Sequence, residues 1–284
     1  MEAWQVARVM IFCQFLLITC ACARPQEKII TSSTDAAAVH SSDENESDWS
    51  YGCVEDGCGP SHWAELSPDW DLCKNGQQQS PINIATFEVV PDPALLPYDP
   101  VCLNTPTTID ANFTNDGHNF KMLRRGVTVL IENINYTLAY LTFKAPSEHT
   151  IDGVQSAFEA QILWKSESGA YAGHAWLYNY NPDGSDNPYL MRYLQHLPAL
   201  HKSGDILVDI PTPFELPEVD IFPYYRYVGS LTSPPCTEGV LWTVDKRVYT
   251  VSEKQQKDLV AALHGVSNRP IQPSNGRIVY GSVY

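Results

Sequence analysis

The segment RRGVTVLIENINYTLAYLTFKA, residues 124–145, constrains the fold more than any other part of the sequence. Its two halves are rich in β-branched and aromatic residues, and the turn-like residues ENIN separate them. This pattern predicts two strands joined by a short turn. The segments AFEAQILWKS (157–166) and GVLWTVDKRVYTV (239–251) predict further strands.

Pro and Gly interrupt the chain at intervals of roughly ten residues after Trp49, which leaves little room for long helices. Short helices are predicted over residues 186–200 and 252–265, and Ser252 is a suitable N-cap for the second one. No internal repeat is evident. At 284 residues the chain suits one large domain, which we expect to span residues 49–284. We expect it to be mainly β, with a mostly antiparallel sheet and small peripheral helices.

The first 23 residues have the features of a secretory signal peptide. Arg8 precedes the apolar run VMIFCQFLLITCACA, and the run ends in the small residues Ala21, Cys22 and Ala23. We predict cleavage after Ala23 and secretion to the extracellular space or apoplast. The run is short for a membrane span, so we expect no membrane anchor.

The mature chain is predicted to begin with a flexible acidic segment, residues 24–48, which is polar and poor in aromatic residues. An oxidising compartment would allow disulfides among the five remaining cysteines, namely Cys53, Cys58, Cys73, Cys102 and Cys236. Because this number is odd, one thiol stays free or pairs between chains in a homo- or hetero-oligomer. The sequons at Asn45, Asn112 and Asn135 are predicted glycosylation sites.

The net charge of −15 argues against nucleic acid and anionic membranes as partners. It mildly favours a cationic small molecule, although solubility alone also accounts for an acidic surface. An apolar content of 44% with 18% charged residues is that of a globular chain rather than a disordered one.

Successive side chains of a strand point to opposite faces of a sheet. The even-numbered residues of Leu138–Lys144 are therefore expected on one face, and the odd-numbered ones on the other. In the next predicted strand, the odd-numbered residues of Glu159–Leu163 share a face. If the two strands are neighbours, Thr142, Lys144 and Gln161 converge on one point. On an isolated strand, Lys144 would instead face solvent.

Five motifs resemble those of plant-type secreted α-carbonic anhydrases. YGCVEDGCGPSHWAEL resembles the opening loop of that family, CKNGQQQSPINI its Gln-Ser-Pro-Ile-Asn-Ile signature, and NDGHNF its Asn-x-Gly-His segment. APSEHTIDG is similar to its Ser-Glu-His-Thr turn, and YRYVGSLTSPPCTEGVLWTV to its Gly-Ser-Leu-Thr-x-Pro-Pro block. The motifs follow the family's order from residue 49 to about 280. The resemblance implies a large twisted, mostly antiparallel sheet with the active site in a cone-shaped cleft.

The resemblance also indicates a lost metal site. In the family, three histidines on two strands hold a zinc ion and a water whose pKa the metal lowers. The corresponding positions here hold Thr142, Lys144 and Gln161. A hydroxyl and an amide oxygen are poor zinc ligands, and an ammonium group repels the ion. We therefore expect neither zinc nor another cofactor, and no zinc-dependent CO₂ hydration.

Other functional residues of the family are present. His118 matches its proton-shuttle histidine, Glu148 and Thr232 match the pair that orients the zinc hydroxide, and Glu159 matches the carboxylate that braces the third ligand. His149 lies in the same turn as Glu148. Each also has a structural interpretation: Glu148 and His149 would hold the turn, and His118 and Thr232 would be architectural.

Lys144 has two interpretations. Without a metal, Glu148 and Glu159 would be carboxylates near the floor of a partly buried cleft, where an unpaired charge is costly. Lys144 would then be a salt-bridge plug. Alternatively, it is an amine of lowered pKa that acts as a general base or forms a Schiff base. A plug keeps its proton near neutral pH, whereas a reactive amine does not.

The cleft is expected to be more apolar than that of a hydratase. Its predicted lining beyond the three ligand positions comprises Tyr140, Glu159, Leu163, Leu231, Ser233 and Trp242. An apolar cone with a few polar groups suits a small organic molecule.

The resemblance further predicts one disulfide. It pairs Cys73 with Cys236, which would tie the opening segment to the Pro-Pro loop. Cys53 and Cys58 lie close together in the sequence, and Cys102 could pair with either of them. The pairing of these three therefore stays open.

Three functions are compatible with these observations. The chain is similar to club-moss carbonic-anhydrase-like proteins that lack the zinc histidines and are linked to alkaloid biosynthesis. This resemblance implies a metal-independent, Mannich-type condensation of an imine, in which Lys144, Glu148 or His118 would move protons. The second is a non-catalytic storage or binding protein, as yam-tuber storage proteins of this fold are. Residual CO₂ hydration is the third, and it would need a metal held without a single family histidine.

Overall fold

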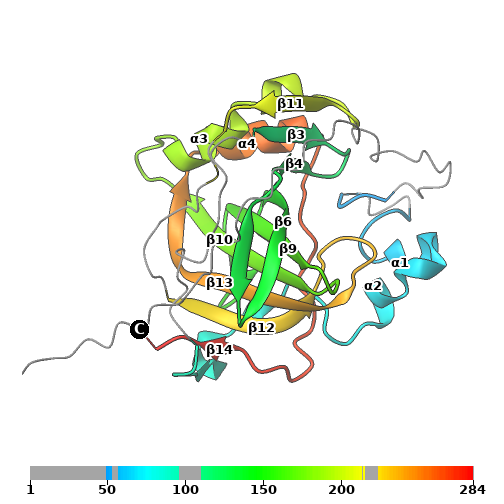
Figure 1. Ribbon diagram of the computed structural model, residues 1–284, viewed down its shortest axis with the longest axis vertical. Coiled ribbons are helices and arrows are strands. Elements are labelled where there is room, and N and C mark those ends of the chain that lie inside the picture. Colours follow the sequence, from blue (N-terminus) through cyan, green and yellow to red (C-terminus); the bar gives the residue numbers. More distant parts are fainter. Residues whose placement is uncertain (1–48, 53–56, 96–109, 213, 215–222, 284) are drawn as a thin grey trace, which may run out of the picture. The chain divides into compact units, whose positions relative to one another are not determined.

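The computed structural model describes residues 49–52, 57–95, 110–212, 214 and 223–283 (Figure 1). The predicted signal peptide, the segment 24–48 with Asn45, and the cysteines Cys53 and Cys102 lie outside these residues. Within the described part of the chain, no helix is long and apolar enough to cross a membrane.

The described residues form many strands and a few short helices. In chain order these are α1 (Trp63–Leu66), η1 (Pro68–Trp70), α2 (Leu72–Asn75), β1 (Asn83–Ile84), η2 (Thr86–Glu88), β2 (Val90–Pro91), β3 (Ala111–Asn115), β4 (Phe120–Leu123), β5 (Thr128–Ile131), β6 (Ile134–Lys144), β7 (Thr150–Ile151), β8 (Val154–Gln155), β9 (Phe158–Ser166), β10 (Tyr171–Tyr180), α3 (Pro188–Leu194), η4 (Leu197–Ala199), β11 (Ile206–Ile210), β12 (Tyr224–Ser230), β13 (Glu238–Val251), α4 (Glu253–Ala262) and β14 (Tyr280–Gly281).

One large sheet dominates the fold, as predicted. Its 11 strands follow the order β11-β3-β4-β6-β9-β10-β13-β12-β14-β2, with β5 paired to β6. Most pairs are antiparallel, but β10 is parallel to β13 and β14 is parallel to β2. The sheet is therefore mixed. A second sheet of three short strands has the order β1-β7-β8.

The hairpin of β5 and β6 follows from its turn residues. Ile131 pairs with Ile134, which leaves Glu132 and Asn133 as a two-residue loop. Both loop residues have positive φ, 49° and 64°. Two-residue hairpin loops favour this conformation because it matches the right-handed twist of the strands. The predicted strand pair with ENIN at its turn is confirmed.

A bulge in β6 changes which face its residues occupy. Register with β9 shifts between Leu138, opposite Trp164, and Tyr140, opposite Leu163. Leu138 belongs to the main core cluster, whereas Tyr140 packs in a second cluster with Leu163. The prediction that Leu138 and Tyr140 share a face is therefore wrong. A bulge inserts one extra residue and so resets the alternation.

The helices α3 and α4 contribute to the main one of three core clusters, and Tyr51 belongs to the third. The main cluster includes Leu190 of α3 and Leu259 of α4 together with residues from the strands β3 to β10. In Figure 1, α3 and α4 lie together near β3 and β11. Ser252 forms a capping box at the start of α4, which confirms its predicted role. The second cluster contains Leu163, Tyr227 and Trp242.

Candidate functional site

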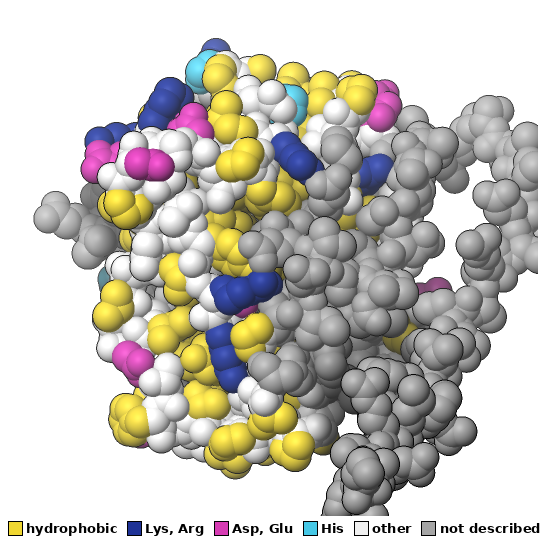
Figure 2. Space-filling view, turned by 90° about the vertical axis from the view of Figure 1, so that its left-hand side faces the viewer, with side chains coloured by type: hydrophobic (Ala, Val, Ile, Leu, Met, Phe, Trp, Pro, Cys, Tyr) yellow, Lys and Arg dark blue, Asp and Glu magenta, His cyan; other side chains and the backbone are white. Residues whose placement is uncertain are grey.

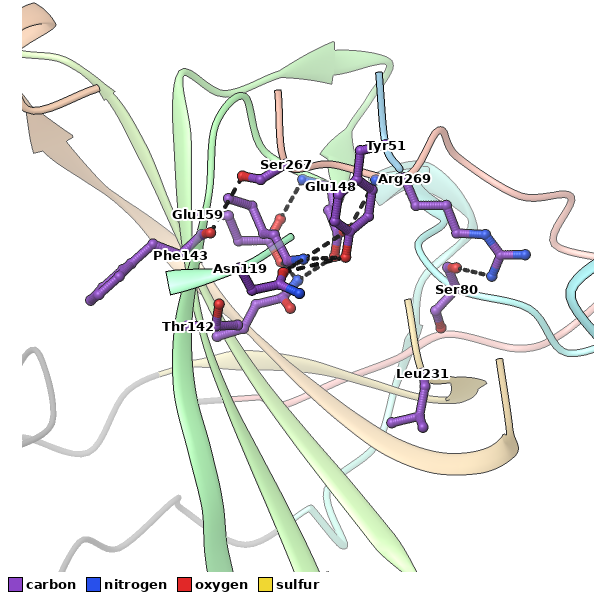
Figure 3. A network of polar contacts seen from close by, with 12 residues as sticks. Tyr51, Ser80, Asn119, Thr142, Phe143, Glu148, Glu159, Leu231, Ser267 and Arg269 are labelled. Atoms are coloured by element: carbon purple, nitrogen blue, oxygen red, sulfur yellow. Dashed lines mark hydrogen bonds and ion pairs between the residues drawn. The ribbon is translucent and has the colours of Figure 1, made fainter. Parts of the chain in front are cut away.

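Two neighbouring strands carry the residues at the predicted ligand positions (Figure 3). β6 and β9 are antiparallel, and their register pairs Thr142 with Gln161 and Lys144 with Glu159. All four are buried polar side chains, whereas Phe143, between Thr142 and Lys144, belongs to the main core. Alternation along both strands thus puts the four polar residues on one face.

The Lys144 ammonium is buried among oxygen acceptors. The residue is 2% exposed, and its Nζ donates to Tyr51 Oη at 2.7 Å and to Asn119 Oδ1 at 2.8 Å. Glu148 Oε1 lies 3.6 Å from the same nitrogen, and the centroid of the Tyr51 ring lies 4.4 Å from it. The ammonium group thus donates two hydrogen bonds to neutral oxygens and forms a longer ion pair with Glu148. We call Lys144, Tyr51, Asn119 and Glu148 the lysine cluster.

The other two residues at the predicted ligand positions also bind protein groups. Thr142 Oγ1 donates to the backbone oxygen of Phe120 on β4 at 2.9 Å. Gln161 Nε2 lies 2.7 Å from Glu148 Oε2 and 2.8 Å from Glu159 Oε1, and it donates to both. The polar atoms of Thr142, Lys144 and Gln161 therefore bind separate partners instead of meeting at one point.

Glu159 accepts hydrogen bonds on both of its oxygens. Oε2 accepts from the backbone nitrogens of Glu148 and His149, each at 2.8 Å. Oε1 is 2.8 Å from His149 Nδ1 and 2.8 Å from Gln161 Nε2. Burial alone would raise the pKa of Glu159, but the charge and hydrogen bond of His149 and the Gln161 amide lower it below its usual value. The fold therefore favours the ionised carboxylate.

A chain of hydrogen bonds continues from Glu159 through the buried His149 ring. Its Nε2 lies 2.7 Å from Tyr227 Oη, which in turn lies 2.9 Å from Ser80 Oγ. Burial raises the pKa of Tyr227, so its phenol stays neutral. The ring thus contacts Glu159 through Nδ1 and the phenol through Nε2. We call Glu159, His149, Tyr227 and Ser80 the histidine relay.

Glu148 connects the two groups. Its Oε1 accepts from the backbone nitrogen of Arg269 at 2.9 Å, and its Oε2 accepts from Gln161. The Arg269 guanidinium donates to the backbone oxygens of Ser80 and Cys73, both at 2.9 Å. Burial lowers the pKa of Arg269 to about 10, although Glu148 acts in the opposite direction. Arg269 thus links Glu148 to Cys73 and Ser80, in the N-terminal part of the described chain.

Tyr51 is a neutral phenol in the lysine cluster. Burial and the charges of Glu148 and Asp116 raise its pKa well above the usual value. Hydrogen bonds with Asn119 and Ser233 act in the opposite direction. Because it keeps its proton, Tyr51 accepts from Lys144 without adding a negative charge to the cluster.

Four of the predicted pocket residues, which we call the apolar wall, lie in or against the second core cluster, beside Tyr227 of the histidine relay. Leu163 and Trp242 are buried in the second core cluster, and Tyr140 and Leu231 pack against it while partly exposed. Figure 3 shows Leu231 set apart from the lysine cluster. In the loop after β12, Thr232 is buried and Ser233 is partly exposed.

His118 lies in the turn between β3 and β4. Asp116 Oδ1 accepts from its backbone nitrogen at 3.0 Å. Its imidazole stacks on Trp49, with ring centroids 3.9 Å apart. The structure thus places this ring against the opening segment, on which Tyr51 also lies.

The predicted disulfide between Cys73 and Cys236 is confirmed, with an S–S distance of 2.04 Å. It joins α2 to the loop between β12 and β13. Cys58 is disulfide-bonded as well. Because Cys53 and Cys102 lie outside the described residues, the choice between these two predicted partners stays open, as does an oligomer formed through an unpaired cysteine.

Two of the three predicted glycosylation sites are described. Asn135 is exposed at the start of β6. Asn112 on β3 is partly buried, and its Oδ1 accepts from the backbone nitrogen of Asp209 at 3.0 Å. Modification of all three asparagines remains a prediction.

Sequence reasoning missed three contributors to the site: Tyr51, Asn119 and Arg269. Tyr51 begins the opening-loop motif, and Asn119 follows His118 in NDGHNF, so both lie inside segments already singled out. Arg269 lies in no such motif, and its contacts with Cys73 and Ser80 cross 196 and 189 residues. No local sequence signal points to that contribution.

Comparison with known proteins places this geometry in a family. Residues 58–283 match the family model described as eukaryotic-type carbonic anhydrase. A carbonic anhydrase of Pectobacterium carotovorum is 36% identical over 234 residues, which cover 81% of this chain and 89% of that protein. Dioscorin DB3L of Dioscorea polystachya is 34% identical over 231 residues, which cover 78% of this chain and 82% of that protein.

Solved structures agree with this placement. A crystal structure of dioscorin complexed with ascorbate matches with a TM-score of 0.71 at 30% identity, covering 82% of this chain and 97% of that one. The matched region includes both strands of the candidate site, since the family model extends from residue 58 to residue 283. The chain therefore belongs to the eukaryotic-type carbonic anhydrase family.

Proposed function

We propose that this protein does not hydrate CO₂ at a zinc ion and instead catalyses a metal-independent condensation of a cationic imine with an enolisable carbon. The observation that carries the first half is the hydrogen bonding of Thr142, Lys144 and Gln161. The second half is supported by the presence of Glu148, by the apolar wall and by the resemblance to alkaloid-forming relatives.

The residues at the ligand positions do not fit a zinc ion. Such a site needs three nitrogen, sulfur or carboxylate ligands aimed at one point. Thr142 Oγ1 is bound to a backbone oxygen, Gln161 directs its amide nitrogen at two carboxylates, and Lys144 brings an ammonium group. Among the described residues, no group of three or more His, Cys, Asp or Glu is arranged to hold a metal. We route no step through a metal.

We assign proton abstraction to Glu148. Its orientation is held by the backbone nitrogen of Arg269 and the amide of Gln161. Glu148 takes a proton from the enolisable carbon, and the freed electron pair forms a bond to the iminium carbon. The π electrons of the C=N bond move to nitrogen and leave a neutral amine. The new amine nitrogen then takes the proton from Glu148 and the product leaves with an ammonium group, which balances the reaction.

Lys144 acts as an electrostatic group in this proposal. Its ammonium group faces Tyr51, Asn119 and Glu148, which supports the salt-bridge interpretation over a Schiff base. A Schiff base would need a neutral amine freed from these acceptors. We assign substrate orientation to Thr232 and Ser233, polar groups beside the apolar wall.

A cationic organic substrate is supported by the charge of the chain. The net charge is −15. On the face shown in Figure 2, Asp and Glu side chains lie singly or in small groups rather than in one patch. Lys and Arg side chains are interspersed with them on this face. The net negative charge of the whole chain raises the local concentration of small cations. Secretion is supported by the disulfides, which form in oxidising compartments.

The test uses the full secreted protein. Metal content and CO₂ hydration are measured first, and we expect neither stoichiometric zinc nor hydration. The protein is then incubated with a cyclic imine and an enolisable ketone, and the condensation product is quantified by mass spectrometry. Glu148→Gln should lower the rate at least 100-fold, in the range of a lost general base. Glu65→Gln, at an exposed carboxylate, is the matched control and should be active.

Stoichiometric zinc with CO₂ hydration would overturn the first half of the proposal. Condensation at the same rate in Glu148→Gln would overturn the role of Glu148.

A second candidate function is binding without catalysis. It is favoured by the lysine cluster, in which the charged and polar atoms are already hydrogen-bonded to one another. It is also favoured by the likeness to dioscorin, whose solved structure contains ascorbate. Saturable binding of ascorbate or a cyclic amine, with no turnover of any imine, would support this alternative.

A further inference from the structure

A hollow of about 410 Å³ lies beside Tyr51. It is lined by residues 50–52 of the opening segment, by Gly117 and His118 in the turn between β3 and β4, and by residues 263–266 after α4. Tyr51 belongs to the lysine cluster, so one side chain separates the hollow from Lys144. The proposed condensation uses neither His118 nor His264.

Among the described residues, the lining of the hollow holds two imidazoles and no carboxylate. Among the described residues that line it, the ionisable side chains are those of Tyr51, His118 and His264. Burial and nearby carboxylates raise the pKa of Tyr51 well above its usual value, so the phenol stays neutral. An imidazole, in contrast, carries an N–H donor. The described lining therefore offers donors to an anionic ligand and no carboxylate to a cationic one.

Two side chains that line the hollow, those of Ser50 and His264, form hydrogen bonds with backbone atoms. Ser50 Oγ accepts from the backbone nitrogen of Gly52 at 3.1 Å, which leaves its hydrogen for a ligand. His264 Nε2 lies 3.1 Å from the backbone oxygen of His201. A carbonyl oxygen only accepts, so Nε2 carries a hydrogen.

Two carboxylates near the hollow, those of Glu148 and Asp116, are each paired with a lysine and so do not repel an anion strongly. Lys144 Nζ lies 2.7 Å from Tyr51 Oη, and Glu148 faces that ammonium at 3.6 Å. Asp116, beside His118, is paired with Lys121 at 2.5 Å. Each of the two neighbouring carboxylates thus has its own cation.

We propose that this hollow binds a small organic carboxylate. The imidazoles of His118 and His264 and the hydroxyl of Ser50 would contact the carboxylate, and Leu263 and Val266 would contact the carbon skeleton. A volume of about 410 Å³ is within the range of small-molecule sites. The inference does not rest on the proposed condensation, which uses neither His118 nor His264.

The test compares three probes of equal chain length on the full secreted protein. Malonate, malonamide and 1,3-diaminopropane are titrated by isothermal calorimetry. We expect malonate to bind at least tenfold more tightly than the neutral amide or the diamine. The double variant His118→Gln, His264→Gln should weaken malonate binding at least tenfold. His62→Gln removes an exposed histidine that pairs with Glu65, and should leave malonate binding unchanged.

A variant that fills the hollow provides an independent check. A Cβ added at Gly265 meets no atom within 4 Å, and the backbone there is not left-handed. We expect Gly265→Phe to fold, which its melting temperature checks, and to lose malonate binding. The proposal is overturned if malonamide or the diamine binds as tightly as malonate, or if malonate binds the double histidine variant and Gly265→Phe as it binds the parent.

Discussion

The lysine cluster and the histidine relay meet in one turn, yet they are held together differently. Glu148 and His149 are consecutive residues between β6 and β7. Along the relay, the links from Glu159 to Ser80 measure 2.8, 2.7 and 2.9 Å. In the lysine cluster, the ion pair with Glu148 is 3.6 Å long, and the shorter contacts of Lys144 are to neutral oxygens.

The difference separates a group that supports the fold from a group that sets the charge of the site. Glu159 binds the backbone nitrogens of Glu148 and His149, so the relay holds the path of the turn. The lysine cluster instead draws side chains from the opening segment and from the turn between β3 and β4. Residues of the lysine cluster can therefore be substituted while the turn of Glu148 and His149 keeps its backbone path.

Loss of the Glu159 charge should have the largest effect on stability. Glu159→Gln leaves two backbone donors and His149 without a charged acceptor in a fully buried site. We expect the free energy of unfolding to fall by about 3–5 kcal/mol. Urea unfolding followed by tryptophan fluorescence measures this change. Glu167→Gln, at an exposed position on the next turn, is the control. A loss below about 1 kcal/mol would contradict the structural role of the relay.

Loss of the Lys144 charge should have a smaller effect. Lys144→Met removes the cation that faces Glu148, while Arg269 and Gln161 still donate to that carboxylate. We expect a loss of about 2–3 kcal/mol at neutral pH. Adding Glu148→Gln should recover part of it, because no unpaired charge then remains. A double-mutant cycle measures the coupling, and strictly additive effects would show that Lys144 is not a plug.

Acidification should weaken the contribution of the histidine relay to stability. The pKa of Glu159 is lowered in the fold, so its contribution to stability is present above the ordinary pKa of a glutamate. That contribution is lost as the pH falls through the lower, folded-state pKa. The parent protein should therefore lose stability below about pH 4.3, and Glu159→Gln should lose less over the same interval. Equal slopes in unfolding free energy against pH would exclude this carboxylate as the cause.

A Tyr→Phe substitution can be made in both the lysine cluster and the histidine relay, and in the lysine cluster it should have the smallest effect on the free energy of unfolding. Tyr51→Phe removes one oxygen from Lys144 but keeps the ring that faces the ammonium. We expect a loss of about 0.5–1.5 kcal/mol. Tyr227→Phe interrupts the relay between His149 and Ser80, and should cost about 1–3 kcal/mol. If Tyr51→Phe proves the more damaging by thermal unfolding, the division between the two groups has to be reversed.

Local patterns are sufficient to predict the parts of the fold that depend on neighbouring residues. The hairpin loop of Glu132 and Asn133 and the capped start of α4 both follow from a few consecutive residues. The mainly β architecture follows from the same strand patterns, and the family resemblance adds the large sheet. The disulfide between Cys73 and Cys236 is predicted by that resemblance alone.

Features that depend on the partner strand or on distant segments escape sequence reasoning. The bulge near Ala139 appears only in the register with β9, and the parallel pairing of β10 with β13 depends on the path between them. Tyr51 reaches Lys144 across 93 residues. The positions of Thr142, Lys144 and Gln161 are predictable from alternation, but the partners of their polar atoms are not.

Arg269 also affects the order in which the site is completed during synthesis. A ribosome adds roughly 5–20 residues per second, so a separation of 196 residues between Cys73 and Arg269 corresponds to roughly 10–40 s. β6 and β9 emerge well before Arg269 and can pair while Glu148 still lacks its backbone donor from residue 269. A nascent chain that ends before Arg269 thus contains the strands of the site without the residue that joins them to the opening segment.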